Sequence, residues 1–405
     1  MLFLSTTINA GTTVSVTTLG NGGVASGNLG SATSVASNLI LNGGTLQYVG
    51  ASASSNRSFT VGATGATFDA AGASGTWTLN GAASLSGTNT ARTVTFANSV
   101  GAQSGVYGTA LADNGTGATS VTKTGAGTWT LSAANTYTGS TTVTGGTLAG
   151  VAGSFANTAS IALTGGTLSA VNYNASATLS LDATSTATIS GSGLNFSGAI
   201  TNANSATANA LNFTAPTGTI TLASLSGAGK TTFASAAAVT GGISGGTVTA
   251  TGALTANVSG GTVSAASLVG DISGNAAVAV TGAITGVVTT TGTVTSGSLS
   301  TNAVSAGTTT VTGNATIAAV SGGVTTIGGV GSLTTVTNGT LNLNGATASV
   351  TTLNGGMVNL GTTVLTVSAG TTSGAITGTA GSLTKSSAGT LTLSGANTYG
   401  GVTTV

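Results

Sequence analysis

A 21-residue segment occurs twice in this chain, and such repetition leaves few architectures open. Its first copy, Lys-Thr-Gly-Ala-Gly-Thr-Trp-Thr-Leu-Ser-Ala-Ala-Asn-Thr-Tyr-Thr-Gly-Ser-Thr-Thr-Val, runs from Lys123 to Val143. It returns from Lys385 to Val405 with 15 of the 21 positions identical. A shorter related motif, two glycines followed by threonine and an aliphatic residue, begins at Gly43, Gly145, Gly165, Gly245 and Gly260. Self-similarity of this kind is typical of proteins in which each repeat stacks on its neighbours.

The C-terminal half of the chain has a shorter and more regular period. Between its glycines lie alternating runs such as Thr247–Thr249 and Thr340–Leu343, with aliphatic residues on one side and Thr or Asn on the other. These runs predict strands of about three to five residues. Ten regularly spaced glycines mark the predicted corners: Gly246, Gly261, Gly274, Gly292, Gly307, Gly323, Gly339, Gly356, Gly370 and Gly389.

Regular spacing of strands and corners favours a solenoid, because a sandwich built from hairpins does not need coils of equal length. We therefore predict an all-β fold, a single elongated β-solenoid (β-helix) with about 16–20 residues per coil, with right-handed winding as the commoner arrangement. Of the 15 aromatic residues, only Tyr399 follows residue 235. Two segments are expected: a wider solenoid over 1–235, containing the aromatics and the first full repeat, and a slimmer one over 236–405, with coils of about 16 residues, ending in a truncated repeat.

Charge is nearly absent from the chain, which has five Lys and Arg, four Asp and Glu together, and no His in 405 residues. So few cations cannot neutralise a row of phosphates, which excludes nucleic-acid binding. The hydrophobic content of 40% argues for a folded chain rather than a disordered one. No apolar run reaches the ~18 residues of a membrane-spanning helix, so no membrane insertion by this segment is expected. With few ionisable groups, stability is expected to vary little with pH.

Catalytic chemistry has few residues to use. The chain lacks His, Cys and Glu, and with them the common general bases, thiolate metal ligands and activated nucleophiles. Glycoside hydrolysis needs paired carboxylates, but at least 44 residues separate Asp69, Asp113, Asp182 and Asp271 from one another. We expect no catalytic residue, no metal and no cofactor, and therefore no enzyme.

The two copies that begin at Lys123 and Lys385 resemble the autotransporter-associated β-strand repeat of bacterial surface proteins. The family pattern is Lys-x-Gly-x-Gly-Thr-aliphatic-Thr-Leu-Ser-Gly-x-Asn-Thr-Tyr-x-Gly-x-Thr-Thr-Val, and Ser387 departs from it where the first copy has Gly125. The two copies cover about a tenth of the chain. The resemblance implies an exported autotransporter passenger built as a β-solenoid, located at the bacterial cell surface or in the extracellular space. It does not imply a catalytic activity.

Three functions are compatible with these features. The leading expectation is a structural extracellular β-solenoid, forming a cell-surface stalk or a head-to-tail filament. The alternative is an adhesin passenger domain that binds host or carbohydrate surfaces. A further alternative is ice binding through Thr-x-Thr arrays such as Thr293 and Thr295, although Thr340/Asn342 and Met357/Asn359 interrupt the array.

Both ends of the sequence carry part of a repeat. Residues 6–12 resemble Thr144–Leu148, which follow the first copy, whereas the second copy ends at Val405. A terminal coil would present unpaired strand edges, and head-to-tail stacking of subunits would cover them. We expect a homopolymer whose stacking interface contains Leu2, Phe3, Leu4, Ile8, Tyr399, Val402 and Val405.

Overall fold

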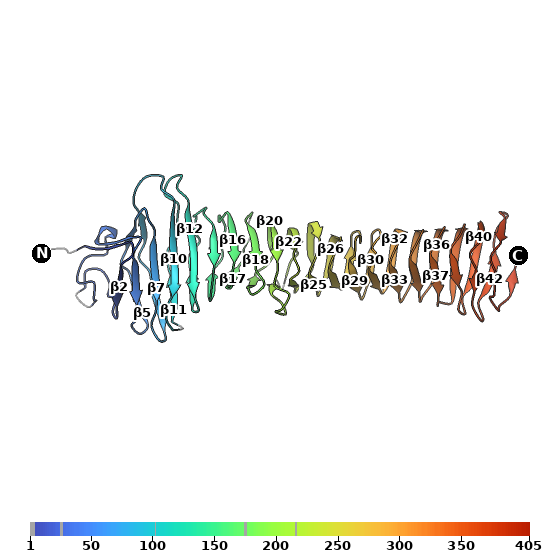
Figure 1. Cartoon of the computed structure of the whole chain (residues 1–405), viewed down its shortest axis with the longest axis horizontal. Coiled ribbons are helices and arrows are strands. Elements are labelled where there is room, and N and C mark those ends of the chain that lie inside the picture. Colours follow the sequence, from blue (N-terminus) through green and yellow to red (C-terminus); the bar gives the residue numbers. More distant parts are fainter. Residues whose placement is uncertain (1–4, 25–26, 102, 174–175, 215–216) are drawn as a thin grey trace. The chain divides into compact units, whose positions relative to one another are not determined.

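The computed structural model describes residues 5–24, 27–101, 103–173, 176–214 and 217–405, which form parallel β-strands wound into coils (Figure 1). The only helical segment among these residues is the single-turn 3-10 helix η1 (Ala36–Asn38). The predicted all-β solenoid is confirmed, with about 19 coils of about 19 residues each. The chain divides into two compact units, unit 1 (Met1–Ala223 and Gly229–Thr232) and unit 2 (Ser224–Ala228 and Phe233–Val405).

The first coils of unit 1 have three strands each, in three parallel rows that we call rows A, B and C. Thr45 pairs with Thr67 in row B, and Ala66 pairs with Val94, so these coils are longer than the sequence period predicts. Such coils enclose a wide interior. Row A contains β1 (Thr6–Asn9), β3 (Leu39–Asn42), β6 (Phe59–Val61) and β9 (Ala83–Leu85).

Later coils of unit 1 have one strand in row B and one in row C. Thr147 pairs directly with Thr167 in row C, so one turn of the solenoid separates these two residues. Over the whole of unit 1, in both kinds of coil, row B contains β2 (Thr13–Val16), β4 (Thr45–Tyr48), β7 (Ala66–Ala70), β10 (Arg92–Asn98), β12 (Thr119–Gly125), β14 (Thr141–Val143), β16 (Ser160–Leu163), β18 (Thr178–Leu181) and β20 (Asn195–Asn202). Row C contains β5 (Ala53–Ser55), β8 (Thr76–Leu79), β11 (Ser104–Tyr107), β13 (Thr128–Leu131), β15 (Thr147–Gly150), β17 (Thr167–Val171), β19 (Thr186–Ser190) and β21 (Leu211–Thr214).

Aromatic side chains fill the interior of unit 1. The strands β8 and β13 share the sequence Thr-Trp-Thr-Leu and place Trp77 and Trp129 inside, with ring centroids 5.7 Å apart. Tyr48 stacks on Trp77 at 5.3 Å, and Phe96 lies 4.8 Å from Trp129. Because rings bury more area than aliphatic side chains, they suit the wide coils of this unit.

The coils of unit 2 also have one strand in row B and one in row C, but each coil contains fewer residues. Thr262 pairs with Ala277 and Thr308 with Val324, so fewer residues complete a coil here than in unit 1. Row B contains β24 (Ala237–Ile243), β26 (Ala253–Val258), β28 (Ser267–Val269), β30 (Ala283–Thr285), β32 (Ser298–Val304), β34 (Ala315–Val320), β36 (Gly331–Val336), β38 (Thr347–Leu353), β40 (Val364–Thr372), β42 (Ser382–Lys385) and β44 (Thr403–Thr404). Row C contains β25 (Thr247–Ala250), β27 (Thr262–Ala265), β29 (Ala277–Val280), β31 (Thr293–Ser296), β33 (Thr308–Val311), β35 (Val324–Ile327), β37 (Thr340–Leu343), β39 (Met357–Asn359) and β41 (Ile376–Thr377).

Three further strands complete the chain. The strand β43 (Leu391–Leu393) pairs with the end of β40. The strands β22 (Ile220–Ser226) and β23 (Lys230–Phe233) contain the residues at which the sequence passes from unit 1 to unit 2.

Glycine and small aliphatic residues explain the slim coils of unit 2. Inward positions of row B hold residues such as Leu254, Leu268 and Ile284, all buried, and strand register stacks them on one another. At the corners, Gly261 has a φ of 78°, and a Cβ there would lie 2.3 Å from the carbonyl oxygen of Gly246 on the preceding coil. Only glycine fits so close an approach in the left-handed region.

Candidate functional site

The four carboxylates lie at separate places and accept hydrogen bonds from nearby backbone N–H groups. Their donors are Ser99 for Asp69, Thr119 and Thr138 for Asp113, Ser185 for Asp182 and Val287 for Asp271. Among the residues that the structure describes, no three His, Cys, Asp or Glu side chains lie close enough to hold a metal ion. These carboxylates therefore stabilise local backbone structure.

The buried arginines of unit 1 bind main-chain carbonyl groups. Arg57 is 3% exposed, and its Nε donates to the carbonyl of Gly20 at 2.9 Å. Arg92 is 5% exposed, and its Nη1 donates to the carbonyl of Val61 at 2.6 Å. Burial lowers the pKa of both guanidinium groups. No pattern in the sequence marks either arginine as functional, and both join backbone segments from different coils.

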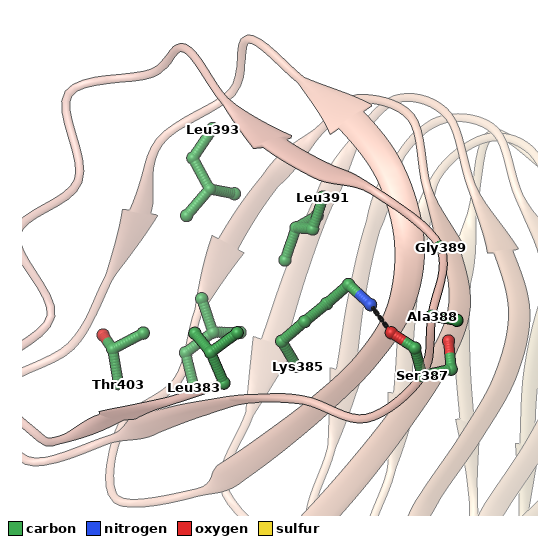
Figure 2. Close-up of a pocket in the computed structure, with 9 residues that line it drawn as sticks. Leu383, Lys385, Ser387, Ala388, Gly389, Leu391, Leu393 and Thr403 are labelled. Atoms are coloured by element: carbon green, nitrogen blue, oxygen red, sulfur yellow. Dashed lines mark hydrogen bonds between the residues drawn. The ribbon is translucent and has the colours of Figure 1, made fainter.

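The two repeat lysines occupy matching sequence positions in different surroundings. Lys123 is fully buried, and its Nζ donates to two carbonyls of its own turn at 2.8 Å and to the carbonyl of Gly145, on the following coil, at 3.2 Å. Burial lowers the pKa of Lys123 to about 8. Lys385 is half-buried, and its Nζ donates to the carbonyl of Ser387 (Figure 2). The second copy thus has a more open environment than the first.

The last coil of unit 2 encloses an open cavity of about 420 Å³. Figure 2 shows Leu391 and Leu393 on one side of this cavity and Leu383 and Lys385 on the other. Leu391 and Leu393 are half-buried, so part of the apolar interior is accessible here. We call this surface the C-terminal coil cavity; its lining residues are Leu383, Lys385, Ser387, Ala388, Gly389, Leu391, Leu393, Thr403 and Val405.

Three of the seven predicted interface residues lie in the last coil. Val402 and Val405 are 70% and 97% exposed, and the Tyr399 and Thr403 hydroxyls lie 2.7 Å apart in a hydrogen bond. Ile8 in β1 is 1% exposed, so unit 1 already covers its side chain and leaves almost no surface for a neighbouring subunit. The remaining three, Leu2, Phe3 and Leu4, lie outside the described residues. Subunit stacking stays a prediction.

A second candidate surface follows the outer side of row B in unit 2. Here a column of hydroxyl side chains continues from coil to coil, each residue being the register partner of the next. We call this set the hydroxyl column: Thr285, Ser300, Thr316, Ser332, Ser349, Thr366, Thr384 and Thr404. The Thr-x-Thr pattern of the sequence does not reveal this column, because its members lie one to a coil and their spacing along the sequence is uneven.

Two hollows lie on this side of row B. One, of about 310 Å³, includes Thr285, Ser300, Asn302, Thr316, Ser332 and Thr334 in its lining. The other, of about 250 Å³, includes Thr255 and Asn257. Thr255 pairs with Val269, which pairs with Thr285, so the hollows occupy successive coils on one face. We call the two hollows together the row B groove.

The Thr-x-Thr array on the outer side of row C is discontinuous, as the sequence suggests. Thr293 and Thr308 are register partners, but Val324 follows them. Thr340 comes next, and Met357 then breaks the column again. A regular surface for ordering water is therefore limited to a few coils.

These features define a class of protein: a parallel β-solenoid whose few charged groups mostly bind its own backbone. Residues 121–149 and 383–405, which contain both copies of the repeat, match the sequence profile of the family described as Passenger-associated-transport-repeat. This match, together with a similar adhesin from Brucella suis, supports the interpretation that the chain is an autotransporter passenger-like repeat protein, as the sequence resemblance predicted.

One relative is the adhesin BmaC autotransporter of Brucella suis biovar 1 (strain 1330), to which the chain is 40% identical over 133 residues. The similar region is 31% of this chain and spans only 4% of that protein. No solved structure matches the chain. No helix in the described ranges is both long and apolar enough to cross a membrane.

Proposed function

We propose that this chain acts as a structural spacer, a stalk, in a passenger-like protein at the bacterial surface or in the extracellular space. The observation that carries the proposal is the regular ladder of unit 2 from β24 to β41, in which each coil adds one strand to row B and one to row C. In such an array each coil contacts only its neighbours, so the number of coils can change without altering the contacts of the remaining coils. The repeat family and the adhesin relative support the location.

A non-catalytic role is part of this proposal. The carboxylates are engaged with backbone N–H groups, and the buried cations are engaged with carbonyl groups. Side chains held in this way stabilise turns and coils rather than meeting around a substrate.

Removal of whole coils tests the spacer role. Deleting residues 308–323 joins Gly307 to Val324, the register partner of Thr308, and so removes one full coil. The matched control deletes residues 308–315, about half a coil, and breaks the register of the strands that follow. We expect the first variant to keep cooperative thermal unfolding and its β-type circular dichroism, and the second to lose both.

Surface labelling tests the location. Antibodies against the chain should label intact cells that produce either the unaltered protein or the full-coil deletion. A full-coil deletion that unfolds like the half-coil control would contradict interchangeable coils. Labelling that requires broken cells would contradict the surface location.

Adhesion is the second candidate function. The relative from Brucella suis is an adhesin, which favours this role, and the row B groove offers an exposed polar surface on which a ligand could lie. Ice binding has less support, because Val324 and Met357 interrupt the row C array.

Head-to-tail association with a second copy is a further part of the proposal. The C-terminal coil cavity exposes apolar side chains, and Val402, which precedes the lining residue Thr403 in the sequence, is 70% exposed. A second copy that covered this surface would bury these apolar side chains, and that burial would favour the association.

A further inference from the structure

The row B groove has the composition and repeat of a site for an extended neutral polymer. We propose that it binds a neutral glycan strand, lying along the direction in which the coils stack. This inference rests on the adhesin role given above and names the ligand class and the surface for it.

The lining of the groove offers hydrogen bonds without charge. Ser300, Thr316 and Ser332 are exposed members of the hydroxyl column, and the structure gives no side-chain hydrogen bond to any of these three described residues. Asn302 is exposed beside them and adds both a donor and an acceptor. The Asn257 Oδ1 accepts from the Asp271 N–H at 2.9 Å, which leaves its amide N–H groups for a ligand. Sugar hydroxyls donate and accept, so they match such a mixed set.

The shape of the groove depends on a close approach between backbones. Gly286 has a φ of 149°, and a Cβ there would lie 2.0 Å from the carbonyl oxygen of Gly270 on the preceding coil. Gly270 lines one hollow and Gly286 the other. Glycine at these two positions therefore allows the backbones of successive coils to approach closely where the two hollows lie.

The regular spacing of hydroxyl groups along the groove suits an extended polymer better than a compact ligand. Successive hydroxyls of the column are separated by one strand spacing, about 4.8 Å. A glycan strand in an extended conformation also presents its hydroxyl groups at regular intervals, so several weak contacts can form together. The larger hollow, at about 310 Å³, is at the lower end of ligand-site volumes, which suits one or two sugars per hollow.

The same lining disfavours other ligands. None of the described residues that line the two hollows is charged, so an acidic polymer would find no cation. None is aromatic either, so the groove lacks the large side chains that contribute most of the binding energy at protein–protein interfaces. Without a ring for sugars to stack on, affinity for each sugar should be low and should rise with glycan length.

Affinity chromatography of the purified full chain tests the proposal. The columns carry immobilised dextran, xyloglucan or galactomannan, three neutral polysaccharides. The groove variant carries Ser300→Ala, Asn302→Ala, Thr316→Val and Ser332→Ala. The matched control removes four hydroxyls from the outer side of row C, with Thr293→Val, Thr295→Val, Thr308→Val and Thr310→Val. Circular dichroism establishes that both variants are folded.

We expect at least one polysaccharide to retard the wild-type chain and the row C control equally. The groove variant should bind about tenfold more weakly, because each lost hydrogen bond contributes modestly. Longer oligosaccharides of the same sugar should bind more tightly than short ones.

Three results would overturn the proposal: no retardation by any of the three polysaccharides, the same loss in the row C control, or inhibition of ice recrystallisation that only the groove variant loses. Surface labelling of intact cells is a separate measurement. Positive labelling without glycan binding would reject the groove as a glycan site and leave the stalk standing.

Discussion

Gly105 lies directly against the indole ring of Trp129, its register partner on the neighbouring strand of row C. A Cβ on Gly105 would fall 2.2 Å from two atoms of that ring, Cδ2 and Cε2. Trp129 is fully buried, and its Nε1 donates to the carbonyl of Ala97 at 2.9 Å. The ring therefore cannot move aside without losing a buried hydrogen bond, and the missing side chain of Gly105 provides its space.

The substitution Gly105→Ala should lower the free energy of unfolding by about 1–3 kcal/mol, the usual cost of overpacking a core. Urea unfolding followed by tryptophan fluorescence measures it. Gly145→Ala is the matched control, because a Cβ there would have its nearest contact at 3.3 Å, with the carbonyl oxygen of Gly125. Equal losses in the two variants would show that the contact with Trp129 is not the cause.

Lys123 should give the chain one pH dependence that its low charge does not suggest. Burial lowers the pKa of this lysine from 10.5 to about 8 in the folded chain. Between these two pH values the unfolded chain holds a proton that the folded chain has released, so deprotonation favours the folded state. Stability should therefore rise as the pH increases above about 8, and this contribution should be absent at lower pH.

The variant Lys123→Met removes that titration. Thermal unfolding of wild type and variant between about pH 7 and pH 9.5, below the ordinary tyrosine pKa, should show a wild-type melting temperature that rises relative to that of the variant as the pH increases. Lys385→Met, the same change at a half-buried lysine, serves as the control and should follow the wild type. Parallel curves for wild type and Lys123→Met would contradict the prediction.

Unit 2 shows why much of this fold is predictable from sequence. The run Thr340–Leu343, expected as a strand, is the strand β37, and Gly339 before it has a φ of 85°. Eight of the ten predicted corner glycines have positive φ, and Gly292 and Gly389 are the exceptions. Local propensity and the coil period agree in this region, so strands that follow a corner glycine, such as β37, could be placed without knowledge of their neighbours.

Features that depend on contacts between coils could not be predicted in the same way. Arg57 binds carbonyls 25 to 37 residues away, and no sequence pattern distinguishes backbone acceptors. The three-row coils of unit 1 likewise depend on how Phe59 and Trp77 pack with other rings. The hydroxyl column becomes visible only once the register is known, although a serine or threonine in every coil was a signal that an alignment of coils could have found.

Two buried threonines in unit 2 allow the stability cost of an unpaired hydroxyl in the core to be measured. Thr309 and Thr325 are register partners in row C, both fully buried, and neither Oγ1 has a hydrogen-bond partner. Burying an unpaired hydroxyl costs about 1–3 kcal/mol. Thr325→Val keeps the shape of the side chain and should raise the free energy of unfolding by about 1 kcal/mol. Thr310→Val, at an outward position, should leave it almost unchanged; a loss of stability in Thr325→Val would mean that the hydroxyl has a partner after all.

The C-terminal coil cavity should control self-association. Leu391 is half-buried on its wall, and Val402 is 70% exposed close by in the sequence. A lysine at either position would place a charge where a second copy has to bury apolar surface, and the uncompensated desolvation should weaken the contact. We therefore expect sedimentation velocity to show concentration-dependent oligomers for the wild type and a shift to monomer for the double variant Leu391→Lys, Val402→Lys.

Val269→Lys is the matched control for this experiment, since Val269 is a 49% exposed valine in row B, far along the sequence from the cavity. This variant should associate like the wild type, because the added charge lies away from the surface that a second copy would cover. Oligomers that survive the double variant but dissociate in the control would place the interface on the side of the solenoid. A wild type that sediments as a monomer at every concentration would contradict self-association through this surface.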